Sequence, residues 1–286
     1  MTANGPGEAV LAYGRMIKFS HSIFAMPFAL AAAVLAAREV SVTPAQVVLI
    51  VLCMVLARST AMGFNRIVDR QFDAANPRTA SRELPAGVLP LSAAVTITSL
   101  AAVLFVLAAA LLHPLCGWLA PVALLVVCGY SYAKRFTSWV HVWLGVALGL
   151  APVAVWIALT GGVAAPALLL AAAVATWVAG FDILYSLQDE AFDRDAGLRS
   201  VPVRLGQRGA LVLSALLHVG TITLLAALPW VVSLDWAYWA GWLLISGVLV
   251  YEHSLVKPGD FSKIDKAFFD LNGYVSLVFF LSIWLA

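Results

Sequence analysis

Long apolar runs, separated by short polar segments, occupy most of the chain. A helix needs about 20 apolar residues to cross about 30 Å of hydrocarbon. Nine runs reach this length, and we expect spans at about 16–37, 43–64, 92–112, 115–133, 138–160, 165–187, 210–230, 233–251 and 268–285. The alternating pattern of a membrane β-barrel is absent from the sequence. The pattern therefore predicts an all-α integral membrane bundle of nine transmembrane helices, with residues 1–286 as a single domain.

Composition agrees with a chain that is surrounded by membrane lipid. Hydrophobic residues make up 63% of the 286 residues and charged residues 11%, against about 45–50% and about 25% in soluble domains. The mean hydropathy is +0.95. The net charge of +2 gives no reason to expect a nucleic-acid partner. The three cysteines lie in apolar runs without ligand spacing, so we interpret them as packing residues.

Basic residues are distributed on one side of the predicted bundle. Fifteen of the 17 lysines and arginines fall in the N-terminal tail and in the loops after even-numbered spans. Cytoplasmic loops of membrane proteins carry such an excess of positive charge. We therefore expect a cytoplasmic N-terminus and a C-terminus on the opposite side of the membrane.

Two groups of acidic residues lie at the cytoplasmic ends of predicted spans. In the first group, Asn65, Asp69 and Asp73 are spaced i, i+4, i+8, which lines one face of a helix with oxygen ligands. In the second group, Asp189 and Asp193 lie seven and eleven residues after Asp182 and return to nearly the same helix face. Both groups are followed by basic loops, so the motif-bearing cytoplasmic regions are about 65–91 and 182–209.

Carboxylates that face each other repel, and a shared divalent cation removes this repulsion. Oxygen ligands without nearby histidine or cysteine favour Mg²⁺, which completes its coordination with water and phosphate oxygens. Arginines suited to bidentate contacts with a diphosphate flank both groups, among them Arg66, Arg78 and Arg199. The pattern predicts a Mg²⁺–diphosphate site at the membrane face. The alternative is two solvated helix ends that local ion pairs stabilise.

These residues resemble the motifs of the UbiA superfamily of intramembrane aromatic prenyltransferases. The first motif, N-x-x-x-D-x-x-x-D, is matched by Asn65, Asp69 and Asp73, and the second by Asp182, Tyr185, Asp189 and Asp193. In the second motif the spacing from Asp182 to Tyr185 is one residue shorter than the idealised pattern. The segment 130–137 resembles the family's tyrosine–lysine–arginine stretch. Segments 21–30 and 76–87 resemble the bacterial 4-hydroxybenzoate polyprenyltransferase-like branch.

The resemblance implies Mg²⁺-dependent transfer of a polyprenyl group from a polyprenyl diphosphate to a ring carbon of an aromatic acid. The acceptor would be 4-hydroxybenzoate or a dihydroxynaphthoate, in ubiquinone or menaquinone biosynthesis at the bacterial inner membrane. Asn65, Asp69, Asp73, Asp189 and Asp193 would hold Mg²⁺. The leaving diphosphate would be neutralised by Mg²⁺ together with Arg66, Arg78, Lys134, Arg135 and Arg199.

The remaining site residues have roles that follow from their positions. Asp182 would orient or deprotonate the acceptor, with metal binding as a competing role. Tyr185, with Phe64, Trp177 and Phe181, would line a dry chamber for the allylic cation. The acceptor carboxylate would bind Arg15, Lys18 and His21, although these residues also suit a simple helix-end anchor.

Other functional classes remain open from the sequence. A membrane transporter could use intramembrane acids for proton or ion coupling, but the acids here lie at one face of the membrane. A CDP-alcohol phosphotransferase also uses D-x-x-x-D, but its D-G…A-R…G framework is missing. Within the resembling family, a haem farnesyl transferase or a chlorophyll-type enzyme stays possible.

Overall fold

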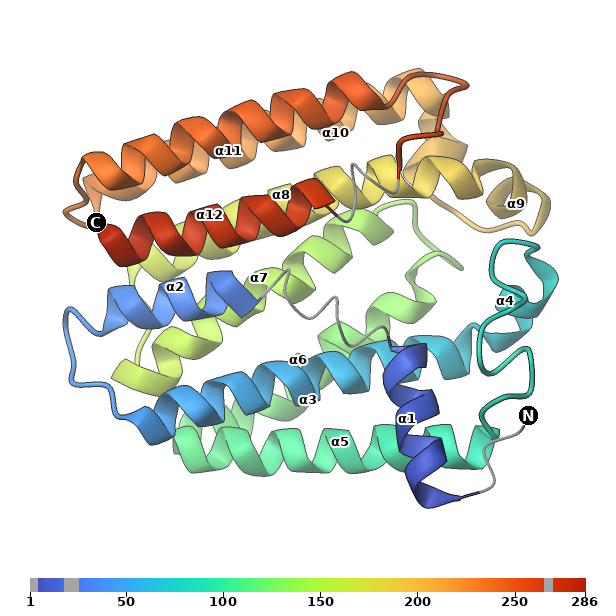
Figure 1. Cartoon of the computed structure of the whole chain (residues 1–286), viewed down its shortest axis with the longest axis horizontal. Coiled ribbons are helices and arrows are strands. Elements are labelled where there is room, and N and C mark those ends of the chain that lie inside the picture. Colours follow the sequence, from blue (N-terminus) through green and yellow to red (C-terminus); the bar gives the residue numbers. More distant parts are fainter. Residues whose placement is uncertain (1–4, 18–25, 265–269) are drawn as a thin grey trace. The chain divides into compact units, whose positions relative to one another are not determined.

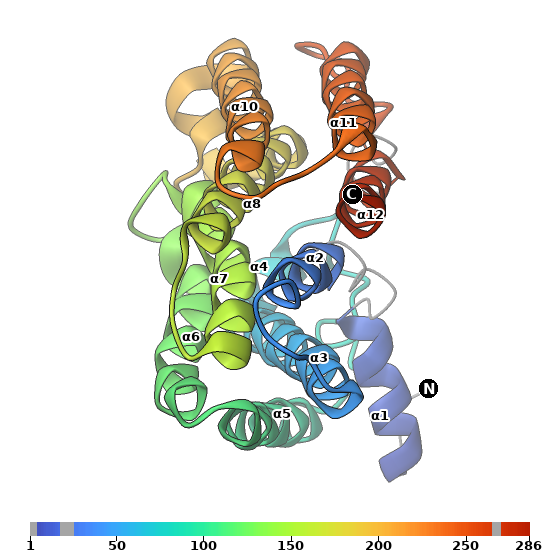
Figure 2. The same cartoon turned by 90° about the vertical axis from the view of Figure 1, so that its left-hand side faces the viewer.

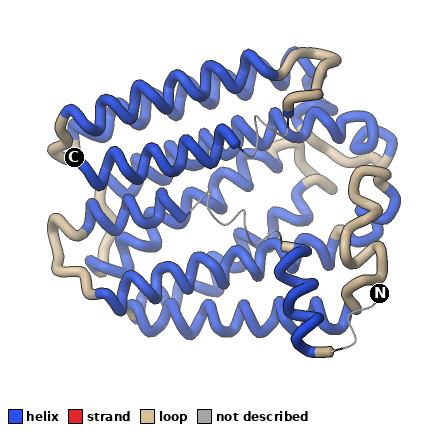
Figure 3. Tube along the Cα trace, in the orientation of Figure 1, coloured by secondary structure: helices blue, strands red, loops and turns tan. Residues whose placement is uncertain are grey.

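The computed structural model describes residues 5–17, 26–264 and 270–286, and within them it is built from helices (Figures 1 and 3). These residues contain no β-strand, and their only β-type pairing is a single backbone bridge between Lys257 and Asp260. The helices are α1 Pro6–Met16, α2 Met26–Ala36, α3 Pro44–Val68, α4 Arg70–Ala75, α5 Leu91–Leu112, α6 Pro114–Ala133, α7 Val140–Thr160, α8 Ala165–Ser186, η2 Leu187–Asp189, α9 Glu190–Asp195, α10 Val201–Ala227, η3 Leu228–Trp230, α11 Trp236–Leu255 and α12 Asn272–Leu285. The all-α prediction is confirmed.

Six stretches of the described chain are long and apolar enough to cross a membrane. They are α3, α5, α6, α7, the stretch from α8 to Asp195, and the stretch from α10 to Trp230. The helices α2 and α12 are apolar but shorter, and α11 is not among the six. The count of nine spans is therefore not confirmed. Part of the first predicted span, residues 18–25, lies outside the described residues.

Helix α10 begins nine residues before the predicted span that starts at residue 210. Ser200 caps this helix, because its side chain accepts a hydrogen bond from the backbone N–H of Val203. Gly206 then interrupts the helix with a φ of 68°, a left-handed conformation that glycine adopts without steric cost. Residues 201–209 include the polar side chains of Arg204, Gln207 and Arg208, so the hydrophobic pattern did not predict this part of the helix.

The described residues form two compact units. The first contains α1, α3 from Val48, and α4 to α6 up to Tyr132. Tyr13 of α1 anchors it, because its hydroxyl donates to the Ser59 carbonyl at 2.8 Å and lies 3.0 Å from Thr98 Oγ1. Gly63 leaves room for this phenol, since a Cβ there would overlap it. Burial raises the pKa of Tyr13, so the hydroxyl stays a donor.

The second unit contains α2 and α7 to α12, with α8 between α7 and α10 (Figure 2). Small residues let these backbones approach each other closely. A Cβ at Gly145 of α7 would overlap the Ala175 carbonyl of α8. On the other side of α8, the Ser214 hydroxyl of α10 donates to the Gly180 carbonyl at 2.7 Å. Helix α8 is therefore fixed from two sides.

A buried polar chain connects α8, α12 and α11. The Trp177 indole donates to Asn272 Oδ1 at 2.8 Å, and the Asn272 amide donates to Glu252 Oε1 at 3.1 Å. Phe28 of α2 lies against the Trp177 ring, with centroids 5.0 Å apart. Trp177 is 0% exposed. Phe28 and Asn272 thus contact it within the packed interior, and its place in the lining of the dry chamber stays a prediction.

Candidate active site

The first acidic motif stands at the junction of α3 and α4. Asp69 lies between these helices, but the helical hydrogen bonds continue through it: Asp69 N–H donates to Asn65 O, and Asp73 N–H to Asp69 O, at 2.9 and 2.8 Å. The expected i, i+4, i+8 spacing is therefore kept. The Asn65 amide also donates to Asp69 Oδ2 at 2.8 Å. Asn65 thus orients the carboxylate beside it.

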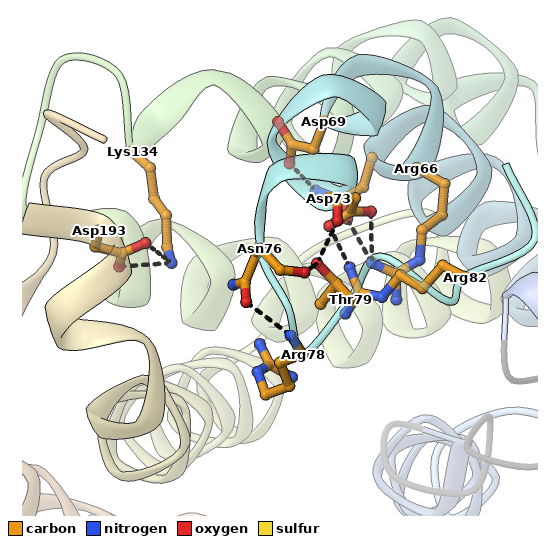
Figure 4. Close-up of polar contacts among 10 residues, drawn as sticks. Arg66, Asp69, Asp73, Asn76, Arg78, Thr79, Arg82, Lys134 and Asp193 are labelled. Carbon is orange, nitrogen blue, oxygen red and sulfur yellow. Dashed lines mark hydrogen bonds and ion pairs between the residues drawn. The ribbon is translucent and has the colours of Figure 1, made fainter. Parts of the chain in front are cut away.

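Asp73 is nearly buried between two arginines (Figure 4). The Arg82 guanidinium donates to its Oδ1, while Arg66 Nη1 lies 3.9 Å from its Oδ2. Within the described residues Oδ2 has no hydrogen-bond partner. Arg66 was expected at the site from the sequence, whereas Arg82 was not. Its position nine residues beyond Asp73, in the basic loop, was the signal available.

The loop after α4 folds back on the same acid. Thr79 Oγ1 donates to the Asp73 carbonyl at 2.9 Å, and Asn76 Oδ1 accepts from the Arg78 N–H at 3.0 Å (Figure 4). These bonds turn the chain immediately after the acidic motif. Arg78 is exposed as a result, as a diphosphate ligand needs to be.

The second acidic motif also stands where the α-helical pattern is interrupted. Helix α8 ends at Ser186, the 3-10 turn η2 carries Asp189, and α9 carries Asp193. The three acids therefore lie on three consecutive segments, α8, η2 and α9, and not on one uninterrupted α-helix. Lys134 Nζ donates to both oxygens of Asp193, at 3.2 and 2.9 Å, although Asp193 is only 2% exposed (Figure 4). This lysine neutralises the buried carboxylate.

The basic segment that contains Lys134 is joined to the loop that contains Arg199. The Arg199 N–H donates to the Lys134 carbonyl, and the Arg199 guanidinium donates to the Phe136 carbonyl, both at 2.7 Å. Two stretches that are about 65 residues apart in sequence therefore meet within the second unit. Arg135 is exposed beside them.

Asp182 has a partner that was not expected from the sequence. Its Oδ2 lies 2.6 Å from Nδ1 of His141, at the start of α7. His141 is fully buried, and its Nε2 accepts from the Val201 N–H at 3.3 Å. A histidine inside a predicted span is a functional candidate on physical grounds, and this signal was available. Tyr185, one turn beyond Asp182 on α8, is half-buried.

The proposed acceptor residues are only partly described. Arg15 is exposed in the last turn of α1, whereas Lys18 and His21 lie outside the described residues. No three His, Cys, Asp or Glu side chains come together as a ready metal-binding group in the described part of the chain. Each acidic motif is organised within its own unit, the first in the unit of α3 and the second in that of α8.

Comparison with known proteins identifies the family. The UbiA prenyltransferase family matches residues 25–284. A 4-hydroxybenzoate octaprenyltransferase of Tolumonas auensis is 32% identical over 237 residues, which is 80% of this chain and 79% of the relative. A UbiA homologue from Aeropyrum pernix K1 has a TM-score of 0.85 and 31% identity, and the match covers 93% of this chain and 98% of that one. A UbiA homologue from Archaeoglobus fulgidus, bound to DMAPP and Mg²⁺, has a TM-score of 0.74 at 18% identity, over 96% and 98% of the two chains. The chain therefore belongs to the UbiA prenyltransferase family.

Proposed function

We propose that the chain transfers a polyprenyl group from a polyprenyl diphosphate to a ring carbon of an aromatic acid, with Mg²⁺ as cofactor. The acceptor is 4-hydroxybenzoate or a dihydroxynaphthoate, so the product enters ubiquinone or menaquinone biosynthesis. The Tolumonas auensis relative is named for 4-hydroxybenzoate and an octaprenyl group. The observation that carries the proposal is that both acidic motifs lie at helix ends with basic side chains against them.

The residues present fit a Mg²⁺ ion. The donor set of Asn65, Asp69, Asp73, Asp189 and Asp193 contains only carboxylate and amide oxygens, which Mg²⁺ prefers. Asp73 Oδ2 is buried without a hydrogen-bond partner in the described residues, so it has a lone pair to offer. The Archaeoglobus fulgidus homologue was solved with Mg²⁺ and DMAPP, an allylic diphosphate. When bound, Mg²⁺ would neutralise charge on the departing diphosphate.

Basic side chains of this chain share that task. We assign Arg66, Arg78, Lys134, Arg135 and Arg199 to the diphosphate, because charge-assisted hydrogen bonds from such groups stabilise the charge that develops on a leaving oxygen. In the structure Lys134 compensates Asp193, and Arg66 stands beside Asp73. The same cations can thus neutralise acids in one state and diphosphate in another. The local ion pairs of the alternative interpretation are therefore compatible with a substrate site.

Cleavage of the carbon–oxygen bond between the polyprenyl group and the diphosphate leaves an allylic cation, which water would quench. Aromatic faces stabilise cations without supplying a nucleophile. Phe64 of α3 lies edge-on to Tyr132 of α6, at a centroid distance of 6.0 Å, within the first unit. In the second unit, Phe181 and Tyr185 lie near the C-terminal end of α8. We propose these rings as the walls of the dry chamber.

The acceptor phenol attacks through a ring carbon, and a base must take a proton from it. We propose Asp182 and Tyr185 as the catalytic pair, with Asp182 orienting or deprotonating the phenol; metal binding is the competing role for Asp182. Arg15, Lys18 and His21 would bind the acceptor carboxylate. Exposure of Arg15 supports its share of this role.

We further propose that the chain spans the bacterial cytoplasmic membrane nine times as one domain of residues 1–286. The N-terminus and the active site would face the cytoplasm. The support is the one-sided distribution of lysine and arginine in the sequence. A count of nine adds α2, α11 and α12 to the six helical stretches that already meet the length and hydropathy of a span.

Membranes that contain the chain, incubated with prenyl diphosphates of several lengths, test the proposal. Each diphosphate is offered with 4-hydroxybenzoate or with a dihydroxynaphthoate, and the extracted lipid is analysed by mass spectrometry. A prenylated product identifies both substrates. If no pair yields product while the membranes show proton-coupled or ion-coupled uptake, the chain is a transporter instead.

Asp69→Asn and Asp189→Asn should each lower product formation by about 100-fold or more, because each removes a charge that the metal site needs. Chelation of Mg²⁺ with EDTA should abolish transfer, and added Mg²⁺ should restore it. Glu39→Gln, an exposed acid in the loop between α2 and α3, is the matched control and should leave transfer unchanged. Wild-type transfer by both aspartate variants would exclude the diphosphate site.

A further inference from the structure

We infer that His141 is the positioning residue of this enzyme: it holds the Asp182 carboxylate through one oxygen and leaves the other oxygen for the acceptor phenol. The inference rests on the proposed function, because it gives Asp182 the role of acceptor base. It concerns the juxtaposition of three segments, namely the start of α7, the end of α8 and the start of α10.

The contacts of His141 use both ring nitrogens. Nδ1 lies 2.6 Å from Asp182 Oδ2, and Nε2 accepts the Val201 N–H at 3.3 Å. Val201 is the first residue of α10, where backbone N–H groups lack helical partners. The imidazole thus satisfies a buried donor at one edge and contacts the carboxylate at the other.

These two contacts determine the protonation of the ring. A backbone N–H can only donate, so Nε2 must carry a lone pair. The single proton of the neutral imidazole is therefore on Nδ1, and it is donated to Asp182. Because Nε2 is committed to Val201, His141 has no free lone pair with which to take a proton from the phenol. The arrangement makes Asp182 the base and His141 the residue that orients it.

Asp182 differs in its partner from Asp73 and Asp193, which belong to the two metal motifs. Asp73 and Asp193 are paired with arginine and lysine, which compensate their charge. Among the described residues the only hydrogen-bond partner of Asp182 is the neutral imidazole of His141, which contacts Oδ2. The Asp182 side chain is 14% exposed, against 2% for Asp193. Oδ1 is therefore the oxygen left to accept a proton from the phenol.

The same junction connects the base to the diphosphate side of the site. Val201 follows Arg199 by two residues, and the Arg199 N–H is bonded to the Lys134 carbonyl. The backbone between Arg199 and Val201 is thus held at both ends by the segment 134–141. A shift of this loop would move His141 and, through it, Asp182. A displacement of about 1 Å in a catalytic group can cost about 100-fold in rate.

Two variants of His141 separate its two contacts. His141→Asn places an amide near Nδ1 and keeps a donor for Asp182, while it loses the acceptor for Val201. His141→Gln places its amide near Nε2, keeps the acceptor for Val201, and loses the donor for Asp182. We expect His141→Asn to stay within about threefold of wild-type kcat, and His141→Gln to lose about 30-fold. KM for the polyprenyl diphosphate should change in neither variant.

A purely structural role of His141 predicts a different result. In that case both variants would lower the melting temperature of the detergent-solubilised protein, and their loss of activity would follow it. The positioning role predicts that the two variants have the same melting temperature and that only His141→Gln loses kcat. In an Asp182→Asn background, His141→Gln should lower the residual transfer by less than about twofold, because the partner it positions is gone.

The outcomes distinguish the inference from the proposal beneath it. If Asp182→Asn transfers at the wild-type rate, the acceptor role of Asp182 fails and the inference with it. If Asp182→Asn is impaired but His141→Gln keeps wild-type kcat, the inference alone is overturned. It is also overturned if His141→Asn is impaired as much as His141→Gln. Absence of transfer by the wild-type chain with every substrate pair would contradict the proposed function itself.

Discussion

One ion pair, between Lys134 and Asp193, stabilises the segment that follows α8. Asp193 is 2% exposed and receives two hydrogen bonds from Lys134, whose side chain is 29% exposed. A buried carboxylate that loses its only compensating cation retains its desolvation cost without the attraction that offsets it. Lys134 is thus a determinant of the stability of the folded chain.

We expect Lys134→Gln to lower the stability of the folded chain by about 2 kcal/mol, which is below the usual cost of breaking a fully buried pair because Lys134 is partly exposed. The melting temperature in detergent checks this. Lys257→Gln, which removes an exposed lysine, should have no effect. The double variant Lys134→Gln/Asp193→Asn should recover part of the loss, since it leaves no buried charge. A double variant less stable than Lys134→Gln would contradict the argument.

At the scale of elements, the close approach of α7 and α8 determines where Asp182 and His141 meet. His141 lies on α7 one turn before Gly145, and Asp182 lies on α8 two turns after Ala175. Because Gly145 has no Cβ, the backbones approach until it faces the Ala175 carbonyl. The hydrogen bond between the two site residues depends on this spacing.

Gly145→Ala should destabilise the chain by about 1–3 kcal/mol, because overpacking forces the two helices apart. Transfer should fall as well, since the separation lengthens the bond from His141 to Asp182. Gly247→Ala is the matched control: this helical glycine has open space around its Cβ direction and should be neutral or slightly stabilising. Equal melting temperatures for the two variants would show that the contact contributes nothing.

At the scale of the whole molecule, the chain is an integral membrane prenyltransferase whose charges concentrate in its predicted cytoplasmic loops. The short connection between α7 and α8 carries Gly161 and Gly162 and no charge, whereas the stretch from α9 to α10 carries several arginines. This asymmetry predicts opposite sides of the membrane for these two connections.

Single cysteines test this orientation in a variant that lacks the three native cysteines. Gly162→Cys and Ala196→Cys both introduce a thiol at an exposed position. On intact spheroplasts, a membrane-impermeant maleimide should label the first and leave the second unlabelled until the membrane is opened. The reverse pattern would place the N-terminus and the acidic motifs outside the cytoplasm.

The sequence by itself determined the membrane setting, the helical class and the residues of the two acidic motifs. These properties are local: apolar runs of sufficient length must become helices in lipid, because their backbone groups have no other hydrogen-bond partners. The spacing of Asn65, Asp69 and Asp73 likewise needs only one helical path, which the backbone bonds through Asp69 preserve. Burial of Trp177 could not be read in this way, since it depends on Phe28 and Asn272.

Only the tertiary structure decided which side chain serves which acid. Arg82 bonds Asp73 because the loop after α4 turns back at Thr79, and Lys134 reaches Asp193 from a segment 59 residues away. His141 meets Asp182 and Val201 because α7, α8 and α10 converge there. Hydrophobic periodicity orients each helix separately and contains no information on such pairings. They arise when packing brings distant segments together and every buried donor must find its acceptor.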